Sequence, residues 1–287
     1  MGLGSFKALG ATYAIAKEAA KSALINESPN KALIGHTFIT ASAGNHGLSL
    51  AAGARIFGAS AVVYLSETVP KKFAEKLREK GAEVVIEGED YEASMKAASK
   101  RAAQESWNLL SDSTWEGYSA GYDVMEGYLM MPQEAFEEIP TSPTHIFLQA
   151  GVGGLAAAVT ASARSNWGSD PKIVIVEPSE APAIMESIKA RKPVYADGKV
   201  SIMGRLDCKE PSHLALYCLA KEADFFMTLT DREVLESIEV LENYGLSTSA
   251  SGGAGFAGLH RALISSECEL SSDSRVLLFL SEGKADD

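Results

Sequence analysis

The chain has 287 residues, of which 46% are hydrophobic and 22% are charged, so it has ample material for a globular core. Its formal net charge of -12 argues against nucleic-acid binding, which depends on clustered lysine and arginine. No apolar run reaches the roughly 18 residues of a membrane span, so neither a membrane segment nor a signal peptide is expected. The three cysteines (Cys208, Cys218 and Cys268) show no metal or disulfide spacing, which favours a reducing compartment and a cytoplasmic location.

Short apolar runs alternate with alanine-rich or amphipathic segments along the chain. The apolar runs predict strands at residues 37–40, 61–65, 83–86, 107–110, 144–149, 172–176 and 275–280. The other segments predict helices at residues 8–24, 48–57, 70–80, 90–105, 117–138 and 155–165, further helix and strand units over 214–264, and an irregular stretch over 190–213. Alternating strands and helices imply right-handed crossovers and parallel sheets, so we predict an α/β fold.

Lys7 lies among glycine, small and aromatic residues, and no charged residue follows it until Lys17. Such surroundings disfavour an ammonium ion, and only a neutral amine attacks a carbonyl carbon. Lys7 is therefore a candidate imine-forming residue, with a buried or snorkelling structural lysine as the alternative.

The glycine turn Gly151-Val152-Gly153-Gly154 joins a predicted strand to a predicted helix. Glycines at such a turn let backbone N–H groups converge on an anion, and the helix N-terminus adds partial positive charge. The turn lacks the Gly-Lys-Ser/Thr of a Walker loop and the third glycine of a dinucleotide-binding turn. A small phosphate monoester fits it better than a dinucleotide, and a tight structural turn is the alternative.

A second strand-to-helix turn is Ser42-Ala43-Gly44-Asn45-His46. Ser42, Asn45 and the backbone amides are candidates to bind a carboxylate or a phenolic oxygen. His46 is either a packing residue at a helix start or a catalytic base.

Two more polar residues follow predicted strands, where open α/β folds bind ligands. Asp112 is either a site carboxylate or the N-cap of a helix beginning near Trp115. Ser281 is a candidate partner for a ring nitrogen, with a turn residue as the alternative. An imine-forming lysine, a phosphate turn, a carboxylate loop and a ring-nitrogen partner are together what pyridoxal phosphate requires.

These motifs resemble those of the tryptophan-synthase-like, or fold type II, pyridoxal-phosphate enzymes. The resemblance to the fold type II enzymes rests on residues 5–7, 42–47, 151–154 and 281–283. The narrower resemblance to the diaminopropionate ammonia-lyases rests on residues 6–10, 111–118, 143–153, 175–178 and 202–211. It implies two open parallel-sheet domains with helices on both faces. The smaller domain, residues 37–118, would carry the carboxylate loop, and residues 1–36 and 119–287 would form the larger, cofactor-binding domain.

The resemblance also implies a role for each motif. Lys7 would be the Schiff-base lysine, Asn45 would bind the 3-hydroxyl of the cofactor, and Asp112 would abstract the α-proton of the L-isomer. The remaining roles are phosphate binding by Gly151, Val152, Gly153 and Gly154, contact with the pyridine nitrogen by Ser281, and substrate binding by Ser42, Ala43, Gly44 and His46.

The activity implied is α,β-elimination of 2,3-diaminopropionate, the L-isomer favoured, to pyruvate and ammonia. The implied cofactor is pyridoxal 5'-phosphate, the substrate a small amino acid, and the assembly a homodimer. Because a β-amine leaves only when protonated, an acid is also needed. The alternatives are a serine or threonine dehydratase of the same fold and a truncated, non-catalytic remnant.

Three features depart from the ammonia-lyase pattern. Ala43 stands where these lyases have an aspartate that acts on the D-isomer, so we expect weak or absent activity on that isomer. The segment before Lys7 is shorter than in the family, so the N-terminal part of the larger domain is expected to be missing. Asp207-Cys208-Lys209 replaces Ala-Cys-Gly, so the loop near the substrate is expected to differ.

Overall fold

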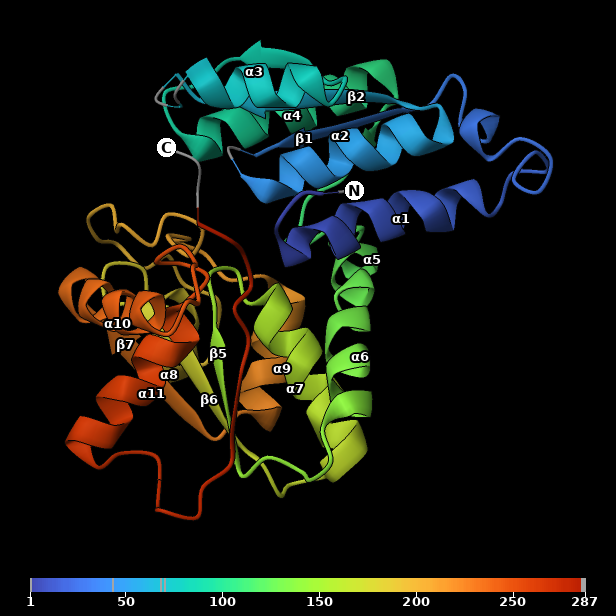
Figure 1. The fold of residues 1–287 in the computed structure, drawn as a ribbon. Coiled ribbons are helices and arrows are strands. Elements are labelled where there is room, and N and C mark those ends of the chain that lie inside the picture. The colour runs from blue at the N-terminus through green and yellow to red at the C-terminus, as the bar shows by residue number, and fades with distance from the viewer. Residues whose placement is uncertain (1, 43, 68, 70, 285–287) are drawn as a thin grey trace. The chain divides into compact units, whose positions relative to one another are not determined.

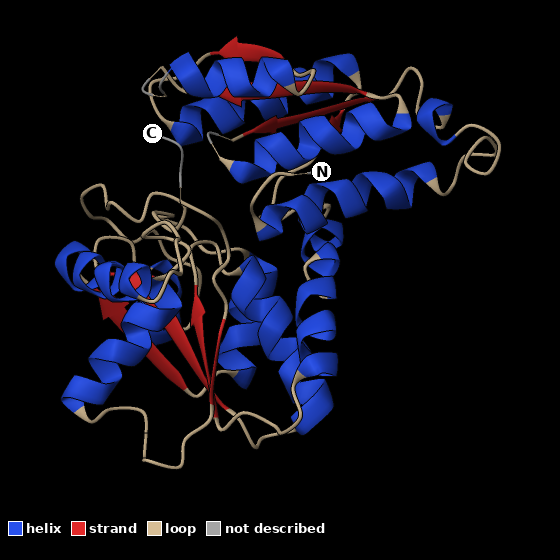
Figure 2. Cartoon of the chain, in the orientation of Figure 1, coloured by secondary structure: helices blue, strands red, loops and turns tan. Residues whose placement is uncertain are grey.

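The computed structural model describes residues 2–42, 44–67, 69 and 71–284. Contacts divide the chain into two compact units, Met1–Gly127 and Tyr128–Asp287. Each unit contains one four-stranded sheet in which every pair of neighbouring strands is parallel. Figure 1 labels the elements in chain order, and Figure 2 distinguishes helices from strands. The predicted α/β class with two parallel sheets is thus confirmed.

The first unit has strands in the order β3-β2-β1-β4. Its elements are the 3-10 helices η1 (Phe6–Leu9) and η2 (Pro29–Lys31), the helices α1 (Gly10–Ala19), α2 (Asn45–Phe57), α3 (Lys71–Glu79), α4 (Tyr91–Glu105) and α5 (Gly121–Gly127), and the strands β1 (Thr37–Ala41), β2 (Ser60–Leu65), β3 (Glu83–Ile86) and β4 (Asn108–Leu109). Successive side chains of a strand point to opposite faces of the sheet. Val62 packs with Ala98 of α4 on one face, and Val63 lies beside Gly47 of α2 on the other.

Small residues let α1 pack closely on α2 and α5. A Cβ atom on Gly53 would lie 3.0 Å from Thr12 Cα, and one on Gly127 would lie 2.4 Å from the Leu9 carbonyl oxygen. This packing groups the residues before β1 with the first unit, whereas the sequence predicted them in the larger domain. The predicted domain assignment differs from the compact units and stays a prediction.

The second unit has strands in the order β7-β6-β5-β8. Its elements are the helices α6 (Met130–Glu138), α7 (Gly154–Trp167), α8 (Ala183–Ala190), α9 (His213–Glu222), α10 (Asp231–Asn243) and α11 (Ala254–Ser265), and the strands β5 (His145–Gln149), β6 (Lys172–Pro178), β7 (Phe225–Leu229) and β8 (Val276–Leu278). Phe147, Val174 and Met227 pack with Ala257 of α11 in one core cluster. Figure 1 shows α7 and α9 on the opposite side of this sheet, so its central strands are buried on both faces, as parallel sheets require.

Three predicted elements differ from the structure. The helix expected over residues 117–138 begins only at Gly121, because a turn pairs Trp115 with Tyr118, and it is divided into the two helices α5 and α6. The helix expected over residues 8–24 ends at Ala19. The apolar run at residues 275–280 predicts a buried type of strand, but β8 covers only Val276–Leu278 and is half-buried, because it lies at the edge of the described sheet. Across the described part of the chain, no helix combines the length and apolarity needed to cross a membrane.

Candidate functional site

Lys7 is paired with Asp112 in the first unit. The backbone N–H of Lys7 donates to Ser5 Oγ at 3.3 Å, which caps η1, and its Nζ forms a hydrogen-bonded ion pair with Asp112 Oδ2. Both side chains are 19% exposed. The Lys7 Nζ atom also lies 5.2 Å from the centre of the Phe6 ring. The residues next to Lys7 in the sequence predicted uncharged surroundings for its amine. The structure differs, because the Asp112 carboxylate reaches the amine from a distant segment of the chain.

The segment that carries Asp112 is fixed by Tyr118. The Tyr118 hydroxyl accepts from the Ser111 N–H at 2.8 Å and donates to the Leu109 carbonyl at 3.1 Å. Burial raises the pKa of Tyr118 to about 12, so this hydroxyl keeps its hydrogen. The next helix begins only at Gly121, so the alternative that Asp112 caps a helix near Trp115 is wrong.

Asp112 is ionised in this arrangement. Burial by itself would raise the pKa of Asp112, but the positive charge of Lys7 and its hydrogen bond outweigh burial and hold that pKa well below its usual range. The first unit therefore holds a carboxylate and an amine in contact, the two groups needed to accept and to donate a proton.

His46 is buried close to this pair, with 3% of its surface exposed. Its Nε2 lies 2.9 Å from the Leu110 carbonyl oxygen, and since a carbonyl only accepts, Nε2 carries the hydrogen. Burial lowers the pKa of His46 more than the Asp112 charge raises it, so the ring is neutral. Its Nδ1 has no hydrogen-bond partner within the described residues. This position supports the packing alternative, because the ring ties the start of α2 to the segment before Asp112.

The loop before α2 is organised by Ser42. Its Oγ accepts from the N–H groups of Gly44 at 3.2 Å and Gly47 at 3.1 Å. Asn45 is the first residue of α2 and is partly exposed. Ala43 lies outside the described residues, so its place in this loop is not part of the structure. The predicted substrate roles of this loop stay predictions.

The glycine turn of the second unit joins β5 to α7. Gly153 has φ of +95°, and a Cβ atom there would meet the Ile184 and Ala215 side chains at 2.9 and 3.0 Å. A Cβ atom on Gly151 would lie 3.0 Å from Cys208 Sγ. Gly153 is also the N-cap of α7 and offers no side chain to the first N–H groups of that helix. The turn therefore combines a packing requirement for glycine with an uncapped helix N-terminus suited to an anion.

Ser281 follows β8 and is 8% exposed. Its Oγ lies 2.9 Å from Gln149 Nε2, and its backbone N–H donates to the Gly252 carbonyl at 3.3 Å. The sequence analysis did not single out Gln149. A polar residue at the end of a predicted buried strand, directly before the glycine turn, was the signal that could have identified it.

Glu177 is a second buried polar residue that the sequence analysis did not assign. It lies near the end of β6, is 1% exposed, and accepts from the backbone N–H groups of Ile184 at 2.7 Å and Met185 at 2.8 Å. Burial raises the pKa of Glu177 to about 8, although these N–H groups favour the carboxylate. Glu177 positions the start of α8, which packs against Gly153 of the glycine turn through Ile184.

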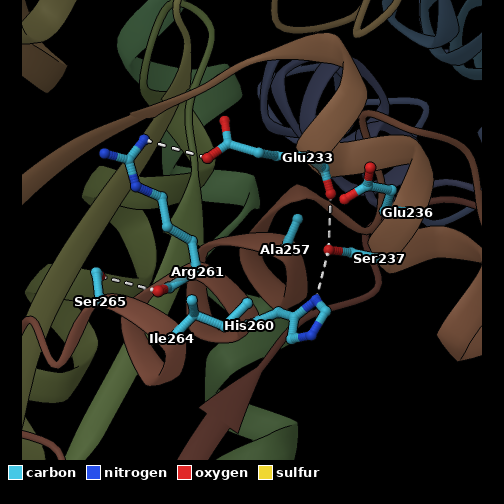
Figure 3. Close-up of a pocket in the computed structure, with 8 residues that line it drawn as sticks. All are labelled: Glu233, Glu236, Ser237, Ala257, His260, Arg261, Ile264 and Ser265. Atoms are coloured by element: carbon cyan, nitrogen blue, oxygen red, sulfur yellow. Dashed lines mark hydrogen bonds and ion pairs between the residues drawn. The ribbon is translucent and has the colours of Figure 1, made fainter.

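A surface pocket lies between α10 and α11 (Figure 3). In it, Ser237 donates to the Glu233 carbonyl at 2.8 Å, and Arg261 forms an ion pair with the Glu233 carboxylate at 3.6 Å. Its lining includes none of the predicted site residues. Among the residues that the structure covers, no cluster of histidine, cysteine, aspartate and glutamate could hold a metal ion.

The donor sets of the two units fit pyridoxal phosphate when each is considered by itself. The first unit supplies a partly buried amine, which could bind an aldehyde carbon, together with a carboxylate. The second supplies an uncapped helix N-terminus for a phosphate and a serine hydroxyl next to an amide NH2 group. These are the groups that an aldehyde-bearing pyridine phosphate needs.

Fold and donor sets together define a pyridoxal-phosphate enzyme of fold type II. Consistent with this, the sequence profile of the family described as "pyridoxal-phosphate dependent enzyme" matches residues 1–282. The chain belongs to this family.

Two relatives illustrate the range of similar sequences. Diaminopropionate ammonia-lyase of Escherichia coli (strain K12) is 30% identical over 310 residues, which cover 99% of this chain and 78% of the relative. L-threonine ammonia-lyase of Thermotoga maritima is 24% identical over 260 residues, which cover 89% of this chain and 59% of the relative.

Solved structures of the Escherichia coli diaminopropionate ammonia-lyase are also similar. The complex with an aminoacrylate-PLP azomethine reaction intermediate superposes with a TM-score of 0.85 at 30% identity. The complex with D-serine superposes with a TM-score of 0.89 at 29% identity. Both alignments cover 99% of this chain and 78% of the relative.

Proposed function

We propose that this chain catalyses pyridoxal-phosphate-dependent α,β-elimination of 2,3-diaminopropionate, preferring the L-isomer, and forms pyruvate and ammonia. One water molecule is consumed, and each substrate molecule gives one pyruvate and two ammonia molecules. The observation that carries the proposal is the contact between Lys7 Nζ and the Asp112 carboxylate. The ammonia-lyase relatives, which align along 99% of this chain, support the choice of substrate.

The cofactor, when bound, acts as an electron sink for the Cα carbanion of the amino acid. Lys7 would hold the cofactor through its amine. Asp112, ionised beside Lys7, would accept the Cα proton of the L-isomer. Lys7, protonated beside Asp112, would supply the acid that the departing β-amine requires. Because the two side chains are hydrogen-bonded, the neutral Lys7 amine left by that step can then take from Asp112 the proton that came from Cα.

The other assignments of the resemblance are part of the same proposal. They are the 3-hydroxyl contact of Asn45, phosphate binding by the glycine turn 151–154, the pyridine-nitrogen contact of Ser281, and substrate-carboxylate binding by Ser42, Ala43, Gly44 and His46. The uncapped start of α7 and the Ser281 hydroxyl support two of them. The homodimer and the cytoplasmic location expected from the sequence also stay predictions, and light scattering would test the first.

A serine or threonine dehydratase is the second candidate. The L-threonine ammonia-lyase relative, which covers 89% of this chain, favours it. Both reactions need the same base, and they differ in the β-substituent that leaves. The product ratio separates them, because serine gives one ammonia per pyruvate and diaminopropionate gives two.

The experiment is a paired spectral and product assay of cofactor-loaded protein. We expect a visible absorbance band from a lysine-bound cofactor, its loss in Lys7→Ala, and two ammonia molecules per pyruvate from L-2,3-diaminopropionate. Lys17→Ala is the matched control, since Lys17 lies on the exposed side of α1 and pairs with Asp123. Folded, cofactor-supplemented protein without that band would overturn the proposal in favour of the non-catalytic alternative.

A further inference from the structure

Gln149 lies at the end of β5 with 1% of its surface exposed. Its side-chain nitrogen Nε2 lies 2.9 Å from each of three oxygens, the Gly252 carbonyl, the Phe279 carbonyl and Ser281 Oγ. Two of these are carbonyl oxygens, which only accept. The NH2 group of the amide must therefore face them, and the opposite orientation would place three oxygens against Oε1.

The other end of the same amide has no partner. Gln149 Oε1 is buried without a hydrogen bond within the described residues. A buried polar atom without a partner destabilises a fold by about 1–3 kcal/mol and calls for a specific explanation. Gly255 makes room for the amide, since a Cβ atom there would lie 2.8 Å from Oε1. Gln149 Oε1 is thus left unsatisfied by the same orientation that places the NH2 group against Ser281 Oγ and two carbonyl oxygens.

This contact determines what the Ser281 hydroxyl can do. An amide nitrogen has no lone pair that accepts, so the Ser281 hydrogen cannot point to Gln149. No acceptor for that hydrogen is found among the described residues around Ser281, which is 8% exposed. The hydroxyl is therefore left as a donor. A ring nitrogen with a free lone pair satisfies it, whereas a protonated ring nitrogen would leave the hydrogen without an acceptor.

The backbone around Ser281 is also fixed. The Ser281 N–H donates to the Gly252 carbonyl at 3.3 Å, and Thr248 Oγ1 donates to the Glu282 carbonyl at 2.6 Å. Ser249 Oγ donates to the Glu282 carboxylate. The loop before α11 therefore holds the backbone on both sides of the Ser281 side chain, and the contact with Gln149 Nε2 holds its Oγ atom.

We propose that Gln149 is a positioning residue that orients the Ser281 hydroxyl as a hydrogen-bond donor toward the unprotonated pyridine nitrogen of the cofactor. The inference rests on the proposed function, since it takes Ser281 as the partner of the ring nitrogen. It goes further by naming the residue that makes the Ser281 hydroxyl the donor to the ring nitrogen.

The test is nitrogen-15 NMR of protein loaded with pyridoxal phosphate labelled at the ring nitrogen. Wild-type protein is expected to show the shift of an unprotonated, hydrogen-bonded pyridine. Ser281→Ala should move the signal toward that of an unprotonated pyridine without a donor. Gln149→Met should move it in the same direction by at least half as much, and the double variant should move it no further than Ser281→Ala. The cofactor dissociation constant of Gln149→Met should rise by about 2- to 10-fold, the weight of one hydrogen bond.

Two further variants keep the result interpretable. Gln149→Glu retains the size of the side chain and replaces the NH2 group by an oxygen that can accept from Ser281. It should therefore move the signal in the same direction as Gln149→Met. It also provides the test if the methionine variant does not fold. Gln133→Met makes the same change on the exposed face of α6 and should leave the signal unchanged.

The inference is overturned if Ser281→Ala moves the signal and both Gln149 variants leave it at the wild-type position. It is also overturned if the wild-type ring nitrogen is protonated. The proposed function fails separately, when wild-type protein lacks the Lys7-dependent absorbance band.

Discussion

The Nζ atom of Lys7 is hydrogen-bonded to Oδ2 of Asp112, although the two residues are 105 positions apart in the chain. Helix η1 carries the amine, and the segment after β4 carries the carboxylate. The positive charge of Lys7 keeps Asp112 ionised despite its burial. This contact makes Asp112 a proton acceptor, and it gives the accepted proton a path to Lys7 once Lys7 has donated its own proton to the β-amine.

Asp112→Asn should reduce kcat for L-2,3-diaminopropionate by about 10²- to 10⁴-fold, the usual contribution of a general base. The amide keeps the size of the side chain but cannot accept the Cα proton. Pyruvate formation at saturating substrate measures the effect, and the visible absorbance shows whether the cofactor is still bound.

The matched control for that experiment is Asp123→Asn. Asp123 also pairs with a lysine, Lys17, but its side chain is 40% exposed and lies on α5. The kcat of the Asp123→Asn variant should stay within about twofold of that of wild type, because an exposed ion pair contributes little to the stability of the fold. Equal losses in both variants would contradict a specific role for Asp112.

Ala43→Asp should create activity on D-2,3-diaminopropionate. The methyl group of Ala43 can neither accept nor donate a proton, and the ammonia-lyase pattern has an aspartate at this position. The ratio of kcat/KM for the D-isomer to that for the L-isomer should rise at least about tenfold, since a positioned base contributes 10²- to 10⁴-fold. Wild-type protein that uses both isomers at similar rates would refute the prediction, and Ala43→Asn is the control without a base.

Glu177→Gln should make stability less dependent on pH. Burial raises the pKa of Glu177 to about 8 in the folded chain, whereas a glutamate in an unfolded chain titrates near about 4.3. Between these values the folded state binds more protons than the unfolded state, so the free energy of unfolding falls as pH rises.

Urea unfolding at several values between pH 5 and pH 8 measures this effect. The loss of stability across that range should shrink by on the order of 1–3 kcal/mol in Glu177→Gln. Glu236→Gln is the control, because the Glu236 side chain is 60% exposed. A wild-type stability that rises from pH 5 to pH 8, with the same slope in Glu177→Gln, would show that Glu177 is ionised throughout.

Gly151→Ala should destabilise the glycine turn. A Cβ atom at this position would lie 3.0 Å from Cys208 Sγ, 3.0 Å from Leu206 Cα and 3.1 Å from the Arg205 carbonyl oxygen. Overpacking of this kind lowers the free energy of unfolding by about 1–3 kcal/mol. Gly204→Ala is the matched control, because a Cβ atom there would meet nothing within 4 Å. Thermal unfolding of both variants checks the prediction, and equal melting temperatures would contradict it.

Much of the local structure could be predicted from the sequence. Asp90 caps α4 by accepting from the Ala93 N–H at 2.8 Å, as an aspartate before an alanine-rich segment indicates. The irregular stretch between α8 and α9 was also predicted correctly. The turn at Tyr118, which delays the start of α5 to Gly121, was not predicted, because the hydrogen bonds of that side chain to Leu109 and Ser111 override local helix propensity.

The sequence by itself determined the α/β class, the family resemblance and the residue types available for chemistry, because these depend on apolar periodicity and on short motifs. Only the tertiary structure decided which groups touch. It paired Lys7 with Asp112, tied His46 to the Leu110 carbonyl, and placed the Gln149 amide against Ser281. Such contacts join segments far apart in the chain. They depend on the order of strands and the packing of helices on the sheets, which local sequence patterns do not encode.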